Sequence, residues 1–500
     1  MPSLANRLAK DSLIYGAGTA FGKLVTLITA PILTRIFSPS DYGIITLIQI
    51  SIGLFFTFAG MNVGSGLSYY YFHFDDDIDR NKTINTGVFV IFFFSFSFAL
   101  LFYSVAPYIS EILQIRDGGR IDGHDLTSYI RIASLSLFFG ILVTSFQVIV
   151  RLLHRPFWFL TIEVTKLTTI LLSTIILVVF LDFGVKGVFW ASVIGSMLGF
   201  LVAFYSISDK LALNFSYTIL TLMLIYCLPQ VPAVIINWLQ SEFGRFFLNK
   251  NATLSELGLY SIAFSISSVL SLGITAFRLS YDPFSLSIMK HPNALIFYRQ
   301  VYSIFSFGCL ALAAAISCFS KPILMILTPY EYHQAHQLLP YLVIAGFYLG
   351  SNNILATPIW LSKRTIGTTY AQLFSCIFLI TFSIILIPIY GAKGAAVGYL
   401  TSVLAQSLAY YWLGRRWYPI PFRFWSVQIF TFIVFSICII NSILTVNQGF
   451  LGSVLFAILF TVIISLILWS FAFNLSEKDK MIFYMKKALD GIQNHFRKSA

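Results

Sequence analysis

Charged side chains recur inside segments that are otherwise apolar, and their signs indicate which chemistry is available. The basic residues in deep or half-deep positions are Lys23, Arg131, Lys166, Arg245 and Arg278, and the one acid is Glu163. A cavity lined this way attracts anions such as phosphate or diphosphate groups through charge-assisted hydrogen bonds. It repels cations. Charge inside a membrane is costly and therefore indicates function.

Helical spacing places these residues on polar stripes. Lys23 shares one face of the segment 11–36 with small and polar residues, so it points toward protein or water near mid-membrane. A second stripe carries Gln230, Asn237, Ser241 and Arg245 at offsets of 7, 4 and 4. A third carries Glu163, Lys166, Thr169 and Ser173. Polar stripes on membrane helices suit a cavity wall better than lipid contact.

Three prolines interrupt these segments and are predicted hinges: Pro31, Pro229 and Pro232. Proline removes a backbone hydrogen bond and kinks a helix.

Simpler interpretations remain open for the same residues. Glu163 and Lys166 are three residues apart and would neutralise each other on a helix. Arg35, Arg131, Arg245 and Arg278 lie near segment ends, where long basic side chains reach the headgroups. Glutamine and asparagine inside membrane helices often only join neighbouring helices.

The elements that must position these residues are membrane helices. The chain is 58% hydrophobic and 10% charged, whereas soluble domains carry about 25% charged residues. Apolar runs of about 20 residues span a hydrocarbon core of roughly 30 Å, and no run alternates as a barrel strand does. The predicted fold is an all-α membrane protein with about fourteen helices, at 11–36, 42–70, 83–109, 127–150, 157–182, 186–208, 213–241, 254–278, 299–328, 338–361, 366–390, 393–413, 424–446 and 449–474.

The sequence repeats at an offset of about 210 residues. Arg35-Ile-Phe-Ser-Pro-Ser-Asp-Tyr-Gly43 matches Lys250-Asn-Ala-Thr-Leu-Ser-Glu-Leu-Gly258 in residue type, and Gly184-Val-Lys-Gly187 recurs as Gly391-Ala-Lys-Gly394. Ser38 with Asp41, and Thr253 with Glu256, have the spacing of capping boxes at helix starts. Duplication of this kind is typical of transporters, which bind substrate between the two halves. The predicted units are a six-helix bundle at 1–210, its repeat at 211–414, two added helices at 415–474 and a tail at 475–500.

The basic residues also orient the chain. With the N-terminus inside, 21 of the 32 Lys and Arg residues fall in cytoplasmic segments and 9 fall outside. The positive-inside rule therefore places both termini in the cytoplasm. The tail has apolar residues at helical spacing flanked by lysine and arginine, which predicts an amphipathic helix on the anionic inner leaflet; a solvated charged tail is the alternative. The net charge of +12 indicates membrane orientation, not nucleic-acid binding, because it is spread over many loops.

Motifs for catalysis or metal binding are weak. Gly18-Thr-Ala-Phe-Gly-Lys23 has the wrong spacing for a phosphate loop, and Asp75-Asp-Asp77 has no nucleotide-binding domain beside it. The five cysteines lie in apolar segments without ligand spacing, so neither a metal site nor a disulfide is predicted. No nucleophile or general-base set is present. We expect a protein that is not an enzyme and needs no cofactor, apart from coupling to protons or sodium, for which Glu163 is the available acid.

The chain resembles the Wzx-type oligosaccharide flippases of the MATE-like superfamily. The resemblance depends on Ser12-Leu-Ile-Tyr-Gly-Ala-Gly18, on Pro31-Ile-Leu-Thr-Arg35 through Gly43, on Arg245 through Phe264, and on the two Gly-x-Lys-Gly motifs; it covers about residues 1–413. It implies two six-helix bundles that rock by alternating access. The implied substrate is a polyprenyl-diphosphate-linked oligosaccharide, moved across the inner membrane of a bacterium. Implied partners are membrane lipids, a polysaccharide polymerase and chain-length proteins.

The resemblance also implies a basic lumen, for which Lys23, Lys166, Arg245 and Arg278 are the candidates. Relatives often carry an acid directly before the basic residue that ends the seventh helix. Gly244 occupies that position here, with Glu242 two residues further back, which weakens the case for a salt bridge or ion coupling on this helix. The arginine pattern of lipid II flippases in the first two helices is missing.

Two other functions compete. A drug or ion antiporter of the same fold would need buried acids in the first or seventh helix, and the predicted segments contain none. A membrane sugar polymerase or transferase would need a large outer loop or catalytic acids on one face, which the sequence also lacks.

Overall fold

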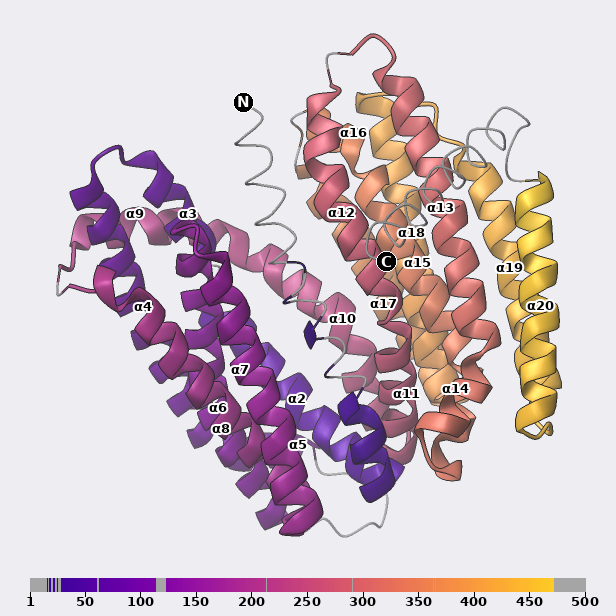
Figure 1. Ribbon diagram of the computed structural model, residues 1–500, viewed down its shortest axis with the longest axis horizontal. Helices are drawn as coiled ribbons and strands as arrows, with labels where there is room; N and C mark the ends of the chain where they lie inside the picture. Colours follow the sequence, from indigo (N-terminus) through magenta and orange to yellow (C-terminus); the bar gives the residue numbers. More distant parts are fainter. Residues whose placement is uncertain are drawn as a thin grey trace, which may run out of the picture.

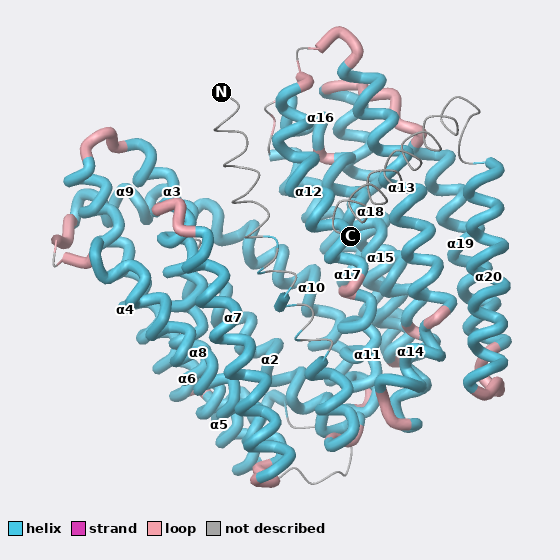
Figure 2. Tube along the Cα trace, in the orientation of Figure 1, coloured by secondary structure: helices cyan, strands magenta, loops and turns pink. Residues whose placement is uncertain are grey.

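The structure is a computed structural model. It describes residues 28–60, 63–113, 123–212, 214–289, 291–362, 364 and 366–471, together with Gly16, Gly18, Phe21, Gly22 and Val25 of the first predicted helix. Helices and short connecting loops make up the whole of this described part, and no strand occurs in it (Figure 2). The predicted all-helical membrane fold is confirmed. The predicted tail at 475–500 lies outside the described residues.

The N-terminal helices are long, apolar runs that begin at local capping signals. Asp76, for example, accepts a hydrogen bond from the backbone N–H of Ile78 and so starts α4. The helices are α2 (Pro39–Gly60), α3 (Val63–His73), α4 (Asp77–Ser104), α5 (Ala106–Leu113), α6 (Gly123–Leu152), α7 (Pro156–Thr174), continued by a π-helical turn at Ile175–Phe180, and α8 (Gly184–Ile207).

The second half begins at Ser216, whose hydroxyl caps the next helix through the N–H of Ile219. Its helices are α9 (Tyr217–Cys227), α10 (Val231–Asn251), α11 (Leu254–Ser267), α12 (Leu270–Ser287), α13 (Ala294–Cys318), α14 (Ser320–Leu327), α15 (Leu339–Leu355), α16 (Thr357–Leu361), α17 (Ile366–Tyr390), α18 (Ala392–Trp417), α19 (Phe424–Leu444) and α20 (Phe450–Phe471).

Ten helices of the described chain are long and apolar enough to cross a membrane. The pair α11 and α12, bent by 42°, would make eleven. The predicted count of fourteen stays a prediction. The first predicted segment lies largely outside the described residues, and the seventh corresponds to α9 and α10, which a 3-10 turn at Leu228–Gln230 separates.

Figure 1 shows two groups of helices, α2–α8 and α11–α20, that approach each other near α2 and α11 and separate toward α3 and α12. The seventh predicted segment joins them. Its first part, α9, packs on α3 and α4, whereas α10 packs on α17, α18 and α2. The sequence prediction assigned this whole segment to the second unit; the structure divides its contacts between the two groups. The exact unit boundaries stay a prediction.

The two copies of the repeated motif meet each other. A Cβ atom on Gly43 would overlap the carbonyl oxygen of Leu254, and one on Gly258 would overlap that of Pro39. Gly258 follows Gly43 by 215 residues, and Leu254 follows Pro39 by the same 215 residues. Each copy of the motif therefore makes the same contact with the other copy, as at a two-fold axis. Glycine at both positions lets the first turns of α2 and α11 cross with their backbones in contact.

The two capping boxes differ in what the acid does. Asp41 accepts hydrogen bonds from the N–H and hydroxyl of Ser38, at 3.1 and 2.7 Å, and completes its own box. Glu256 instead accepts from the N–H of Ala392 at 2.8 Å and caps α18. That cap sits beside Gly391, which has a φ of 55°, the same value as its counterpart Gly184.

Candidate functional site

Arg245 lies in the interior where both groups of helices meet. Its Nη1 donates to Oε2 of Glu242 over 3.0 Å, and the two side chains are 14% and 20% exposed. The guanidinium carbon lies 4.0 Å from the centre of the Phe264 ring, a cation–π contact. The Nε–H is buried and has no acceptor among the described residues. The guanidinium therefore keeps a donor for a further polar or anionic group.

Aromatic side chains from three other helices surround this arginine. Tyr42 of α2, Tyr260 of α11 and Tyr399 of α18 all lie within electrostatic range of its guanidinium. The Phe264 and Tyr399 rings are 5.8 Å apart. Arg245 on α10 thus lies close to elements of both groups, next to the crossing of α2 and α11.

This geometry corrects two expectations. The glycine at position 244 weakened the case for a salt bridge on this helix, but a salt bridge is present. Glu242 lies one helical turn before Arg245 and pairs with it. The seventh segment also does contain a partly buried acid, since α10 continues to Asn251 and includes Glu242, whereas the predicted segment ended at residue 241.

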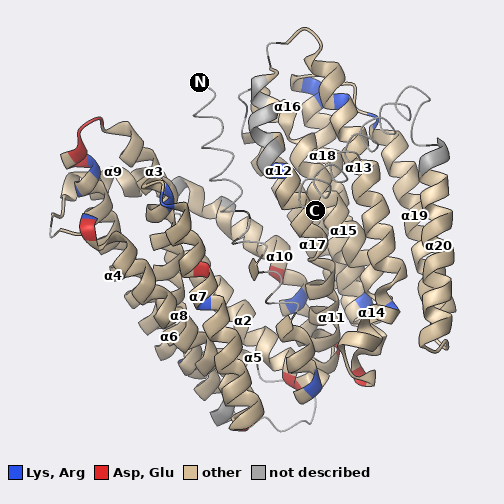
Figure 3. Cartoon of the chain, in the orientation of Figure 1, with Lys and Arg blue, Asp and Glu red and all other residues tan. Residues whose placement is uncertain are grey.

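A second charged cluster lies inside the first group. Lys166 donates to Oε2 of Glu163 over 2.8 Å, both side chains are 17% exposed, and the amide of Gln147 donates to the same oxygen at 2.8 Å. A Cβ atom on Gly22 would lie 3.8 Å from Oε1 of Glu163, so this glycine lies beside the cluster. Mutual neutralisation of Glu163 and Lys166, one of the two sequence interpretations, matches this arrangement. Figure 3 shows that most other charged residues lie near helix ends.

Gln230 and Asn237, the other two predicted site residues of the α10 stripe, have different surroundings from Arg245. Gln230 receives a hydrogen bond from Ser65 of α3 at 3.3 Å and donates to the carbonyl of Tyr226. Asn237 is exposed and accepts from Gln372 of α17. They join neighbouring helices, and their contact with substrate stays a prediction. Pro229 lies in the 3-10 turn and Pro232 in the first turn of α10; their role as hinges, and that of Pro31, also stay predictions.

The other predicted basic residues that the structure describes are more exposed than Arg245. Arg35, Arg131 and Arg278 have exposed side chains. Arg131 lies over the ring of Tyr103 at 5.1 Å, an arrangement that suits the snorkelling interpretation. Lys23 lies outside the described residues.

Sequence analysis missed a buried network that holds α10 on the second group. The amide of Gln240 donates to Ser375 at 2.9 Å and to Gln406 at 3.1 Å. Asn352 also donates to Gln406, at 3.2 Å. These residues belong to four different helices, so the spacing of residues along one helix could not predict their contact.

Sequence analysis also missed Lys321 on α14. It is buried, and its ammonium group donates to the carbonyls of Thr445, Val446 and Gln448 at 2.5, 2.9 and 2.7 Å. Burial lowers the pKa of Lys321. Its role is to cap the end of α19.

Comparison with known proteins agrees with this architecture. A model of the family described as polysaccharide biosynthesis protein matches residues 32–328. No curated protein sequence matches the chain.

Three solved structures share the fold. "Lipid II flippase MurJ, inward closed conformation" has a TM-score of 0.72 at 17% identity, covering 91% of this chain and 99% of that one. A multidrug resistance MATE family transporter of the MOP superfamily matches in its inward-facing conformation with a TM-score of 0.66 at 13% identity, covering 81% and 96%. An outward-facing conformation of a MATE family transporter scores 0.54 at 15% identity, covering 85% and 96%.

The resemblance predicted from the sequence is therefore confirmed at the level of family and fold. Because the family match covers more than half of the sequence, this chain is a multi-pass membrane protein that belongs to the polysaccharide biosynthesis protein family, with a fold shared by flippases and multidrug transporters.

Proposed function

We propose that the chain is a flippase for a polyprenyl-diphosphate-linked oligosaccharide. It would move this lipid from the inner to the outer face of a bacterial cytoplasmic membrane, for O-antigen, capsule or exopolysaccharide synthesis. The observation that carries the proposal is Arg245, a guanidinium held close to both helix groups, whose buried Nε–H has no acceptor among the described residues. A diphosphate is the anion that such a donor set recognises.

Transport of this kind needs no covalent step. A bare diphosphate cannot cross hydrocarbon, so it must pass along polar side chains while its lipid tail stays in the bilayer. The two helix groups would rock about the crossing of α2 and α11 and expose Arg245 to each side in turn. Protons or sodium would drive the cycle, with Glu163 and Glu242 as the acids available.

The arrangement supports an inward-facing state. The chain superposes better on the inward-facing MATE transporter than on the outward-facing one. The helix groups separate toward α3 and α12, which precede loops that the positive-inside rule assigns to the cytoplasm. Both termini would then be cytoplasmic. A polysaccharide polymerase and chain-length proteins are the partners that would use the flipped product.

The test is a strain that lacks the gene, complemented with wild-type protein, Arg245→Ala or Arg416→Ala. Arg416 is an exposed arginine at the end of α18 and serves as the matched control. We expect Arg245→Ala to reach the membrane at normal abundance, to abolish surface polysaccharide and to trap the complete diphosphate-linked unit on the inner leaflet. Arg416→Ala should restore export. Normal polysaccharide with Arg245→Ala would contradict the proposed role of this residue.

The lipid-linked intermediates separate the competing functions. A complete unit trapped in the deletion strain supports a flippase, whereas a shortened unit would indicate a transferase. Unchanged polysaccharide with altered drug sensitivity would indicate an antiporter.

Glu242 favours a cation-coupled multidrug antiporter as the second candidate, because such a protein would need a buried acid in this helix. Here the carboxylate of Glu242 is already neutralised by Arg245, so it offers little attraction to a cationic drug. Loss of drug resistance in Glu242→Gln, with intact surface polysaccharide, would favour the antiporter.

A further inference from the structure

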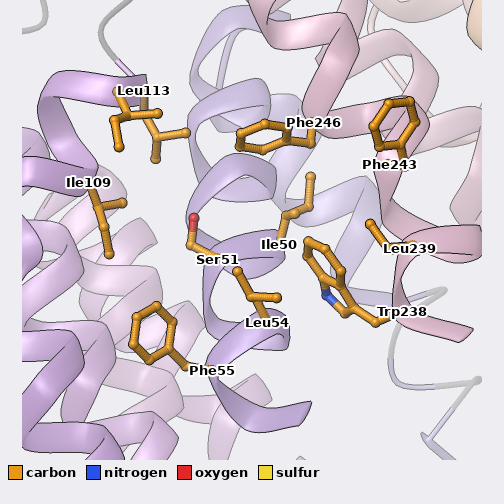
Figure 4. Close-up of a pocket in the computed structure, with 11 residues that line it drawn as sticks. Ile50, Ser51, Leu54, Phe55, Ile109, Leu113, Trp238, Leu239, Phe243 and Phe246 are labelled. Carbon is orange, nitrogen blue, oxygen red and sulfur yellow. The ribbon is translucent and has the colours of Figure 1, made fainter. Parts of the chain in front are cut away.

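An apolar pocket opens between three helices beside the Arg245 site. It has a volume of about 380 Å³ and is lined by Ile50, Ser51, Leu54 and Phe55 of α2, by Ile109, Ile112 and Leu113 of α5, and by Trp238, Leu239, Phe243 and Phe246 of α10. Figure 4 shows these side chains converging on the open space between the helices. Small-molecule pockets have volumes of roughly 300–1,000 Å³.

The pocket offers no charge and almost no polarity. Its one hydroxyl, on Ser51, already donates to the carbonyl of Leu47 at 3.0 Å. The rest of the lining consists of aromatic rings and branched aliphatic side chains, and its one other polar side-chain atom is the indole Nε1 of Trp238, which is buried and has no partner among the described residues. Such a surface binds hydrocarbon and rejects a sugar or a phosphate, whose polar groups would lose their hydration without replacement.

The pocket has two lining side chains at the protein surface: Ile112 is 70% exposed and Phe246 is 38% exposed. Exposed apolar side chains on membrane helices face lipid, so a hydrocarbon chain would enter the pocket sideways. Trp238 and Phe246 precede the end of α10 by 13 and 5 residues, or roughly 20 and 8 Å at 1.5 Å per residue. Under the predicted orientation, this places the pocket in the middle and outer part of the bilayer.

The walls of the pocket belong to different helix groups. α2 and α5 are part of the first group, whereas Gln240 fixes α10 to α17 and α18 of the second. Glu242 and Arg245 lie on the same turns of α10 as Phe243 and Phe246. An amphiphile with an anionic head and a hydrocarbon tail would therefore find a partner for each end within a few turns of one helix.

We propose that this pocket binds a segment of the isoprenoid chain of the lipid-linked substrate while its diphosphate occupies the Arg245 site; the proposal depends on the proposed flippase function. An isoprenoid carries a methyl branch on every repeating unit, and it fills a wide, irregular aromatic pocket better than a straight acyl chain does. Because the pocket lies between the two helix groups, its occupant is coupled to their rocking.

The experiment uses the purified full-length protein in vesicles of phosphatidylethanolamine and phosphatidylglycerol. The probe is a polyisoprenyl diphosphate with a diazirine on its chain, and labelled peptides are identified by mass spectrometry. We expect labelling of α2, α5 and α10 around Leu54, Ile109 and Trp238, displaced by unlabelled polyisoprenyl diphosphate. Excess phosphatidylglycerol should not displace it.

Two variants fill the pocket from different helices, Leu54→Trp on α2 and Ile109→Trp on α5. The matched control is Leu101→Trp on α4, where the leucine is 48% exposed and outside the pocket. Losing burial equivalent to one large aliphatic side chain lowers binding about tenfold. We expect specific labelling to fall about tenfold in both filled variants and to stay at the wild-type level in the control. All three proteins should elute as single species in size-exclusion chromatography.

Other outcomes would overturn the inference. Equal labelling by a diazirine-bearing phospholipid would identify the occupant as bulk lipid, and labelling that both filled variants retain would place the chain elsewhere. A separate measurement in the same vesicles adds the lipid-linked oligosaccharide and follows its movement across the bilayer by wild-type protein. If that movement occurs and the pocket stays unlabelled, only this inference fails; if wild-type protein neither moves nor binds the lipid, the proposed function fails as well.

Discussion

Two of the cations in the described helices, Lys166 and Arg245, are partly buried and each is paired with an acid, which limits how cationic the interior is. Lys166 lies against Glu163, and Arg245 lies against Glu242. An isolated charge at this depth costs more than one that has a partner of opposite sign. Arg245 differs from Lys166 because its Nε–H has no acceptor in the described part of the chain and because it has an aromatic neighbour at the junction of both helix groups.

Removing Glu163 tests the energetic role of the inner pair. Glu163→Ala leaves the ammonium of Lys166 and the amide of Gln147 without their shared acceptor. We expect a loss of about 2 kcal/mol in stability, since breaking a buried charged hydrogen bond is costly. Thermal unfolding in detergent, followed by size-exclusion chromatography, should show a melting temperature lower by several degrees.

Asp77→Ala is the matched control, because Asp77 and Arg80 form an ion pair of the same spacing with the Asp77 side chain 90% exposed. An exposed pair contributes little, so this variant should melt as wild type does. Equal melting temperatures for both variants would show that Glu163 and Lys166 contribute no more than a surface pair.

At the scale of helices, the repeated motif functions as a crossing point. Its capping boxes start α2 and α11, and its glycines let the two starts pack backbone to backbone. Three of the four capping-box side chains serve their own helix, while Glu256 caps α18 instead. The duplicated sequence thus specifies similar local turns but not identical long-range contacts.

Gly43→Ala and Gly258→Ala test this crossing. Each added methyl group meets a carbonyl oxygen of the opposite helix, which cannot move aside as a flexible side chain can. We expect each variant to lose about 1–3 kcal/mol through overpacking and to reduce surface polysaccharide in the complemented deletion strain.

Gly308→Ala on α13 provides the comparison, since nothing lies within 4 Å of its added methyl group. It should be neutral or stabilising by up to about 1 kcal/mol, from helix propensity alone. Full export by Gly43→Ala and Gly258→Ala would mean that the close crossing is dispensable.

At the scale of the whole molecule, the proposed orientation assigns opposite ends of the helices to opposite sides of the membrane. Asp75 lies in the loop between α3 and α4, and Tyr330, 85% exposed, lies just after α14. The five native cysteines are buried, so background labelling should be low.

We expect a membrane-impermeant maleimide to label Tyr330→Cys in intact cells. Asp75→Cys should react only after the membrane is permeabilised, because the positive-inside rule places its loop in the cytoplasm. Unmodified protein gives the background in both conditions. The reverse labelling pattern would invert the topology and with it the inward-facing assignment.

Much of the candidate site could be read from spacing because helix geometry is local. The pairing of Glu163 with Lys166 follows from their separation of three residues, and the stripe position of Arg245 follows from the helical period. The pairing of Glu242 with Arg245 has the same separation of three residues. It was not predicted because the resemblance directed attention to position 244, directly before the arginine, and because the predicted helix ended at residue 241.

By itself, the sequence determined that this chain folds as membrane helices, that a motif is duplicated, and that basic residues lie inside apolar segments. Hydropathy, capping and periodicity are properties of neighbouring residues, so they need no fold. Only the tertiary structure decided that Gly43 meets Leu254, that Gln240 joins Gln406, that Lys321 is buried, and that α2, α5 and α10 enclose an apolar pocket. These contacts join residues far apart in the chain, and packing between helices fixes them.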